Sequence, residues 1–137
     1  MNDEKCRNRH VWSLLLRAVQ IAFVEAAGSD EVAIYESAED GAFRLLASHG
    51  LEGLNLERFR PGDGPVGRAF AEGMIWINPR QAVEKSEVTA WIPLRADDSL
   101  NGAVVIFGPA KRIDLDVLTV LASLSAAILR GYRSVSQ

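Results

Sequence analysis

The sequence is poor in the residues that carry out covalent and metal chemistry. Its 137 residues include one cysteine, Cys6, and two histidines, His10 and His49. One cysteine excludes a disulfide within the chain, and nothing in the composition indicates an oxidising compartment, so we expect a cytoplasmic protein. No C-x-x-C or H-x-x-x-H pattern and no acidic ligand cluster occurs, so we predict no metal site. Because a nucleophile needs a base within reach, we also predict no catalytic residues and no enzyme activity.

The sequence also lacks an excess of positive charge and an uninterrupted apolar run. Its net charge is -3 at pH 7 without any basic cluster, which argues against a nucleic-acid partner. Residues 11–27 are mostly apolar, but Arg17, Gln20 and Glu25 interrupt them at helical spacing. A signal peptide would be uninterrupted there, and a membrane span would need about 20 apolar residues. We therefore expect an amphipathic helix and no membrane segment.

The apolar and turn-forming residues that remain predict a single α+β domain. We place it over residues 1–137, with a core from about 12 to 132 and a mobile N-terminus over 1–9. Because neighbouring strands are joined by hairpins, the sheet should be antiparallel, with helices packed on it. The predicted elements, in chain order, are a helix over 10–27, strands over 32–36 and 42–48, a short helix over 65–72, strands over 74–78, 89–95 and 103–107, and a helix from the N-cap Asp114 to Tyr132. A turn over 96–102 joins the last two strands.

The two long helices are apolar around most of their circumference. In the first, Ser13, Arg17 and Gln20 share one narrow sector; in the last, a single stripe holds the polar residues Asp116, Thr119, Ser123 and Arg130. A helix on a sheet needs only a modest apolar stripe, and soluble monomers rarely expose a large apolar patch. We therefore predict a homodimer through a bundle of the terminal helices. The alternative is that the two helices bury each other's flanks within one chain.

Alternation along the strand over 89–95 suggests where a ligand would bind. Ala90, Ile92 and Leu94 point to one face, which suits packing under the helices, while Trp91 and Arg95 point to the other. An apolar pocket with one charged group would fit that second face. Two further candidate ligand-binding residues lie nearby in the predicted sheet: Trp76 in the preceding strand and His49 at the end of the second. The alternative is that both tryptophans belong to the core and that His49 lies at the sheet edge.

A short pattern, R-x-x-D, occurs at Arg95 and Asp98. Arginine can stack on a guanine or pair with phosphate, and a carboxylate can accept from a base edge, so the pattern leaves a cyclic-di-GMP receptor open as a minor alternative. A hairpin turn supplies the same residues without any ligand.

Blocks spread over residues 12–132 resemble the GAF domain family. The resemblance rests on residues 32–35 and 43–51, on 59–73, and on 91–95 with 101–107. It implies a central antiparallel sheet with the terminal helices on one face and a short helix and loop that form a small-molecule pocket on the other. GAF domains act mostly as regulatory modules that bind small molecules or only dimerise, and fold-level likeness does not choose among these roles.

Two features of this sequence differ from those of the GAF family and argue against some of the functions that its members have. Members that reduce free methionine sulfoxide depend on cysteines near the pocket, and this chain has only Cys6. The segment between Ile77 and Trp91 is shorter than the lid that ligand-binding members usually carry. We expect a non-catalytic, homodimeric sensor domain for a small cytoplasmic ligand, acting in signalling or transcriptional regulation; its cofactor stays unknown. The alternative is a ligand-free dimerisation or protein-interaction module, and the chain can equally be free-standing or a fragment of a longer regulator.

Overall fold

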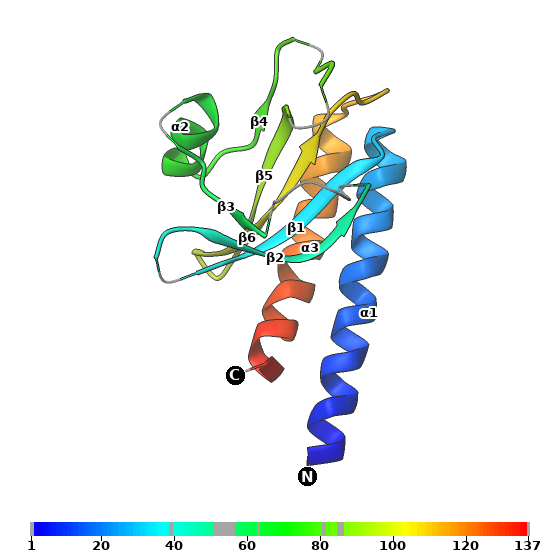
Figure 1. Cartoon of the computed structure of the whole chain (residues 1–137). Coiled ribbons are helices and arrows are strands. Elements are labelled where there is room, and N and C mark those ends of the chain that lie inside the picture. Colours follow the sequence, from blue (N-terminus) through cyan, green and yellow to red (C-terminus); the bar gives the residue numbers. More distant parts are fainter. Residues whose placement is uncertain are drawn as a thin grey trace.

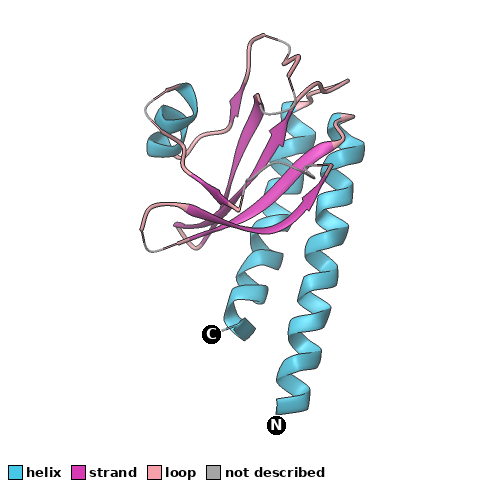
Figure 2. Ribbon diagram, in the orientation of Figure 1, coloured by secondary structure: helices cyan, strands magenta, loops and turns pink. Residues whose placement is uncertain are grey.

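A six-stranded antiparallel sheet with two long helices on one face forms the body of the protein (Figures 1 and 2). The computed structural model describes residues 2–38, 40–50, 57–62, 64–80, 82–84 and 87–136. The strand order is β3-β2-β1-β6-β5-β4. The elements are α1 (Asn2–Ala27), β1 (Glu31–Ser37), β2 (Phe43–His49), β3 (Arg58–Phe59), α2 (Pro65–Glu72), β4 (Trp76–Ile77), β5 (Val88–Ala96), β6 (Ser99–Phe107) and α3 (Leu115–Ser136). The predicted α+β class and antiparallel sheet are confirmed.

The expected turn over residues 96–102 is wrong, because the hairpin between β5 and β6 turns on two residues alone. Asp97 and Asp98 have φ angles of 54° and 64°, and β6 begins at Ser99. Two consecutive left-handed residues are typical of a tight hairpin turn, and aspartate tolerates that conformation better than most residues. Asn101 and Gly102, expected in the turn, lie inside β6 instead.

Strand β3 was not predicted, because two residues carry no periodicity. Phe59 pairs with Phe43, and Arg58 pairs with Arg44, so β3 extends the sheet beyond β2. The connector expected over 50–57 falls mostly on residues 51–56, which lie outside the described residues.

The N-terminus of α1 differs from the prediction, and that of α3 agrees with it. Helix α1 begins at Asn2, eight residues before the expected start at His10, and so includes most of the segment expected to be mobile. Residues 4–9 contain glutamate, lysine and arginine, which favour helix, and neither glycine nor proline. Helix α3 follows Asp114, whose Oδ1 accepts hydrogen bonds from the main-chain N–H groups of Asp116 (3.0 Å) and Val117 (3.2 Å). The predicted N-cap at Asp114 is therefore confirmed.

The side of the sheet that faces α1 and α3 is aliphatic. Its buried residues come from both helices and from the three strands β1, β5 and β6: Leu16, Val19, Phe23, Ala27, Val32, Ile34, Ala90, Ile92, Leu94, Val104, Ile106, Leu118, Ala122, Ala126 and Leu129. The predicted aliphatic face of β5, formed by Ala90, Ile92 and Leu94, is confirmed. Helices α1 and α3 also pack on each other, most closely where Trp12 lies against Gly131; a Cβ built at Gly131 would lie 2.3 Å from the indole ring.

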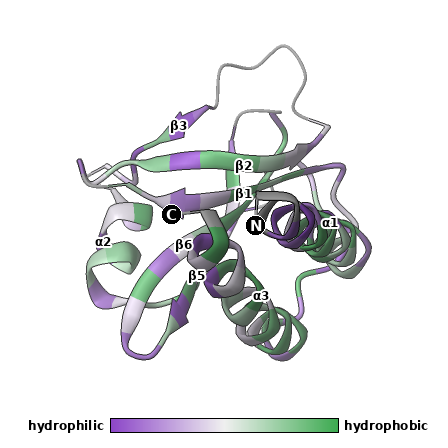
Figure 3. Cartoon of the chain, turned by 90° about the horizontal axis from the view of Figure 1, so that it is seen from below, coloured by the Kyte–Doolittle hydropathy of each residue, from purple (hydrophilic) through white to green (hydrophobic). Residues whose placement is uncertain are grey.

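The solvent side of both helices is apolar. In α1, Gln20 is buried and Ser13 is half-buried, so Arg17 alone of the three residues in the polar sector is exposed. The large aliphatic side chains opposite the core are exposed instead, and we call them the outer helical face: Val11, Leu14, Leu15, Ile21, Val117, Val120 and Leu124. Figure 3, seen from below, shows hydrophobic residues along both helices. By length and composition alone, residues 7–27 and 115–135 are apolar enough to cross a membrane, although part of each packs on the sheet.

Candidate functional site

Aromatic rings fill the sheet face opposite the two long helices. We call this group the aromatic cluster: Tyr35, Phe43, Phe59, Phe70, Trp91 and Phe107. Trp91 lies at its centre and is fully buried. Phe59 stacks on Trp91 with ring centroids 5.8 Å apart, and Phe43 meets it edge-on at 5.1 Å. Offset and edge-on pairs of this kind stabilise the fold beyond the area that they bury.

Strand alternation and one short helix bring these rings together. Tyr35, Trp91 and Phe107 are on β1, β5 and β6 and point away from the aliphatic core, as the period of two requires. Helix α2 covers them with Val66, Ala69 and Phe70 on one side. Its predicted range, 65–72, is confirmed: it has proline at its first position and ends at Gly73, whose φ of 69° is left-handed.

The aromatic cluster contains one polar group that has no partner. The indole Nε1 of Trp91 is buried and donates to no acceptor among the described residues. A buried donor without an acceptor costs about 1–3 kcal/mol, so such groups are rare in folded proteins. The surroundings are strongly desolvating, since burial raises the pKa of Tyr35 to about 12. The rings of the cluster pack on one another around Trp91, and its side chains offer no nucleophile and base pair.

The structure brings together two of the four residues predicted to bind a ligand. Trp76 is the register partner of Trp91 on the neighbouring strand and packs against the aromatic cluster. Arg95 is exposed; its guanidinium lies beside Gly73 at the end of α2, and its Nη2 donates to the carbonyl of Asp98 (3.2 Å). Thus Arg95, near the end of β5, bonds to Asp98 in the hairpin turn that follows.

The fourth predicted residue, His49, lies apart from the aromatic cluster. It is exposed at the end of β2, where its Nδ1 is 2.9 Å from the carbonyl oxygen of Asp30. Phe43, which belongs to the cluster, is at the opposite end of the same strand. This geometry matches the alternative in which His49 is a sheet-edge residue.

Sequence reasoning missed most of the aromatic cluster. The alternation of β1 and β6 carried a signal for Tyr35 and Phe107, because each directly follows an isoleucine of the aliphatic core. Phe59 had no comparable signal, since it lies in a strand of two residues. Across the described ranges, histidine, cysteine, aspartate and glutamate form no group of three or more that is arranged to hold a metal ion.

The fold of this chain is that of GAF domains in other proteins. The second GAF domain of DevS from Mycobacterium smegmatis aligns with a TM-score of 0.64 and 15% identity over 91% of this chain and 95% of that one. A GAF domain/HD domain protein from Geobacter sulfurreducens aligns with a TM-score of 0.69 and 10% identity over 91% and 94%. The type II free methionine-R-sulfoxide reductase from Thermoplasma acidophilum aligns with a TM-score of 0.70 and 20% identity over 91% and 96%. No family model and no curated protein matches the sequence. At these identities the comparisons establish a GAF-like fold.

Proposed function

We propose that this chain is a non-catalytic regulatory domain that acts as a cytoplasmic homodimer in signalling or transcriptional regulation, through its terminal helices, and binds a small molecule at the aromatic cluster. The observation that carries the proposal is the outer helical face. Its seven aliphatic side chains are between 37% and 69% exposed, on helices whose opposite sides form the core.

The size of this apolar face favours a second copy of the chain as its partner. The exposed aliphatic area amounts to roughly 600 Å², at the upper end of the largest patch on a typical monomer and close to the ~800 Å² that each partner buries in a stable interface. Both helices contribute, so two copies related by a two-fold axis would form a four-helix bundle. The polar stripe of α3, which includes Thr119 and Ser123, would border that bundle.

Binding of a small ligand is supported by the unpartnered indole N–H of Trp91. A ligand with an acceptor would satisfy this donor, and stacking on the indole would add affinity. Phe59, now stacked on Trp91, would have to move aside. It lies on the two-residue edge strand β3, which few main-chain hydrogen bonds hold in place. The alternative, a ligand-free dimerisation module, rests on the same stacking, because Phe59 already fills the space beside Trp91.

The position of Cys6 supports a non-catalytic role. Methionine sulfoxide reductases are among the proteins of similar fold, so their chemistry needs to be considered for this chain. The resemblance implies that such activity depends on cysteines near the pocket. Cys6 is on α1, ten residues before the first buried core residue Leu16, and α1 packs on the sheet face opposite the aromatic cluster. At 1.5 Å per residue this is about 15 Å along the helix axis.

Native mass spectrometry and light scattering test the proposal. We expect a dimer that dissociates in the variant Val120→Glu/Leu124→Glu, because two buried charges would enter the bundle. The matched control Thr119→Glu/Ser123→Glu changes exposed polar residues of the same helix turns and should leave the dimer intact. A monomeric wild-type protein at micromolar concentration would contradict the dimer. A noncovalent adduct that is present under gentle conditions and lost under denaturing ones would support ligand binding, whereas a dimer without one would favour the ligand-free module.

A further inference from the structure

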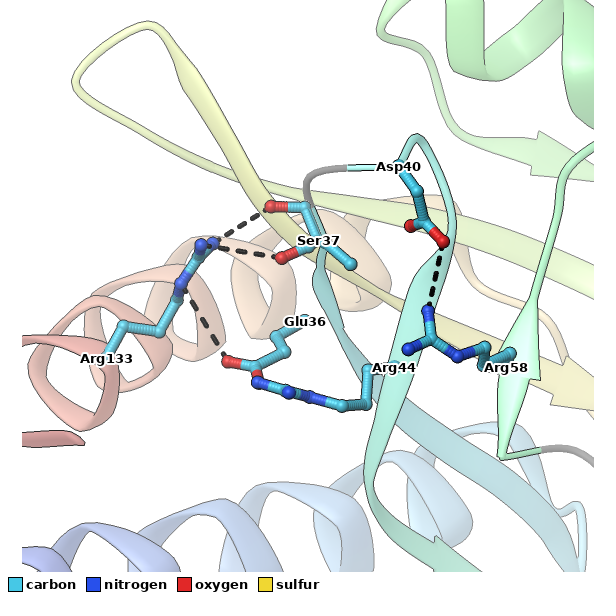
Figure 4. A pocket seen from close by; sticks show the side chains of 7 residues that line it. Glu36, Ser37, Asp40, Arg44, Arg58 and Arg133 are labelled. Carbon is cyan, nitrogen blue, oxygen red and sulfur yellow. Dashed lines mark hydrogen bonds and ion pairs between the residues drawn. The ribbon is translucent and has the colours of Figure 1, made fainter. Parts of the chain in front are cut away.

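A charged hollow lies under the sheet at the end of the β1–β2 hairpin, away from the aromatic cluster. It has a volume of about 590 Å³ and is lined by Glu36, Ser37, Ala38, Asp40, Arg44, Arg58 and Arg133. Figure 4 shows that these side chains come from three neighbouring strand regions and from the last turn of α3. We propose that this hollow is a binding site for a small oxyanion, a phosphate or carboxylate group held by Arg44 and Arg58.

Strand pairing places two arginines side by side. Arg44 on β2 and Arg58 on β3 are register partners, so their side chains leave the sheet on the same face. Like charges directly opposite each other on paired strands are destabilising. An oxyanion bridging the two guanidinium groups would remove this repulsion, and arginine is the residue best suited to bind such groups through two parallel hydrogen bonds.

The neighbouring carboxylates use only part of the donor capacity of these arginines. Arg44 donates through Nε and Nη2 to Glu36 Oε1, and Arg58 donates through Nη1 to Asp40 Oδ2 (3.2 Å). Among the described residues, Arg44 Nη1 and Arg58 Nε and Nη2 donate to no acceptor. The arginine side chains are 63% and 58% exposed, so a ligand from solution can reach them.

The charges of the described lining residues leave the hollow positive. Arg44, Arg58 and Arg133 outnumber Glu36 and Asp40 by one, and Arg60 adds a further positive charge through its own contact with Asp40 (3.4 Å). The carboxylate of Glu36 raises the pKa of Arg44 through their hydrogen bond and by its charge, so Arg44 stays ionised. A small monoanion or dianion would balance the surplus, and the volume of the hollow is ordinary for a metabolite site.

The hollow is also connected to α3. Arg133 donates through Nη1 to Ser37 Oγ (2.9 Å) and to the carbonyl of Asn101 (2.7 Å), and its Nε lies 3.9 Å from Glu36 Oε2. Glu36 is almost fully buried and therefore a fixed part of the wall. An anion that draws Arg44 away from Glu36 would strengthen the hold of Arg133 on Glu36, so occupancy of the site would act on the last turn of α3.

Titration calorimetry at constant ionic strength tests the site with inorganic phosphate and with succinate as probes, against chloride. We expect one or both probes to bind the wild-type protein, and Arg58→Gln to weaken that binding roughly tenfold by removing a charge-assisted hydrogen bond while the Arg44–Glu36 pair stays in place. Asp40→Asn should strengthen binding several-fold, because it removes an internal competitor for Arg58 and Arg60. The control Arg68→Gln removes an exposed arginine from α2, outside the hollow, and should change the affinity less than twofold.

Binding of phosphate alone would identify the ligand as a phosphate compound, and binding of succinate alone would identify it as a carboxylate; either supports the site. Equal affinities in wild type, Arg58→Gln and Arg68→Gln would overturn it, as would weaker binding in Asp40→Asn. Binding of an acidic peptide without either small anion would also overturn it. Because no residue of the outer helical face or of the aromatic cluster is changed, this result stands independently of the proposed dimer and its ligand.

Discussion

The two faces of the sheet are built from different residues and serve different purposes. The face under α1 and α3 is aliphatic, and many combinations of branched side chains of the right volume would pack there. The other face is aromatic, with rings in defined orientations around Trp91 and one buried donor that has no acceptor among the described residues. Generic burial therefore builds the helical side of this domain, whereas the aromatic side carries rings in specific orientations and the charged side chains of Arg44, Arg58 and Arg133 gather in the hollow.

The largest expected effect on stability comes from replacing Trp91, and it should exceed the effect of replacing its register partner Trp76. Trp91→Ala should lower the free energy of unfolding by about 3–5 kcal/mol, because it removes a fully buried ring that contacts Phe43, Phe59 and Phe70. Trp76→Ala should cost clearly less, because Trp76 is only half-buried. Urea denaturation of both variants measures the difference. Equal losses would mean that the aromatic face has no dominant central residue.

High pH should destabilise the aromatic face through Tyr35. Burial raises the pKa of its hydroxyl to about 12, so the folded protein keeps a proton that the unfolded chain loses near pH 10. Its contribution to stability is therefore fully present below pH 10 and falls by about 1.4 kcal/mol per pH unit up to pH 12. Denaturation of wild type and Tyr35→Phe between pH 8 and 12 measures this term, which should be missing from the variant. Parallel curves for the two proteins would contradict it.

A smaller effect is expected at Gly102 on β6, which lies beside β1 and Leu129 of α3. A Cβ at Gly102 would lie 2.1 Å from the carbonyl oxygen of Tyr35 and 2.6 Å from Leu129. Gly102→Ala should therefore lower the free energy of unfolding by about 1–3 kcal/mol through overpacking. In Gly64→Ala, the control, a Cβ would meet no atom within 4 Å. Thermal unfolding compares the variants, and an unchanged melting temperature for Gly102→Ala would show that β1 and Leu129 move aside for the added methyl group without loss of stability.

Much of the fold could be predicted where the signal is local. Helix α2 begins at Pro65 and ends at the C-cap Gly73, and Asp114 caps α3. The alternation of β5 places Ile92 on the aliphatic face and Trp91 on the aromatic face. These features depend on backbone dihedral angles, hydrogen bonds within one turn, or a period of two, all of which are properties of short segments.

The candidate sites were harder to predict because they depend on pairing between distant segments. His49 and Trp91 were both predicted to bind a ligand, yet only Trp91 belongs to the aromatic cluster, because β2 contributes to that cluster through Phe43, at the end opposite His49. The row formed by Arg58, Arg44 and Glu36 exists only through the register of β3 with β2 and of β2 with β1. No local pattern in the sequence encodes that register.

By itself, the sequence determined the α+β class, the apolar character of both terminal helices and the alternation of the long strands. These follow from composition and from periods of 2 and 3.6 residues, which act along the chain. Three features could be seen only in the tertiary structure. Gln20 faces inward while Val120 and Leu124 face solvent. Phe59 stacks on Trp91, and Arg44 and Arg58 lie side by side. The reason is physical: strand register and helix rotation minimise the free energy of the whole packed core, so they depend on residues far apart in the chain.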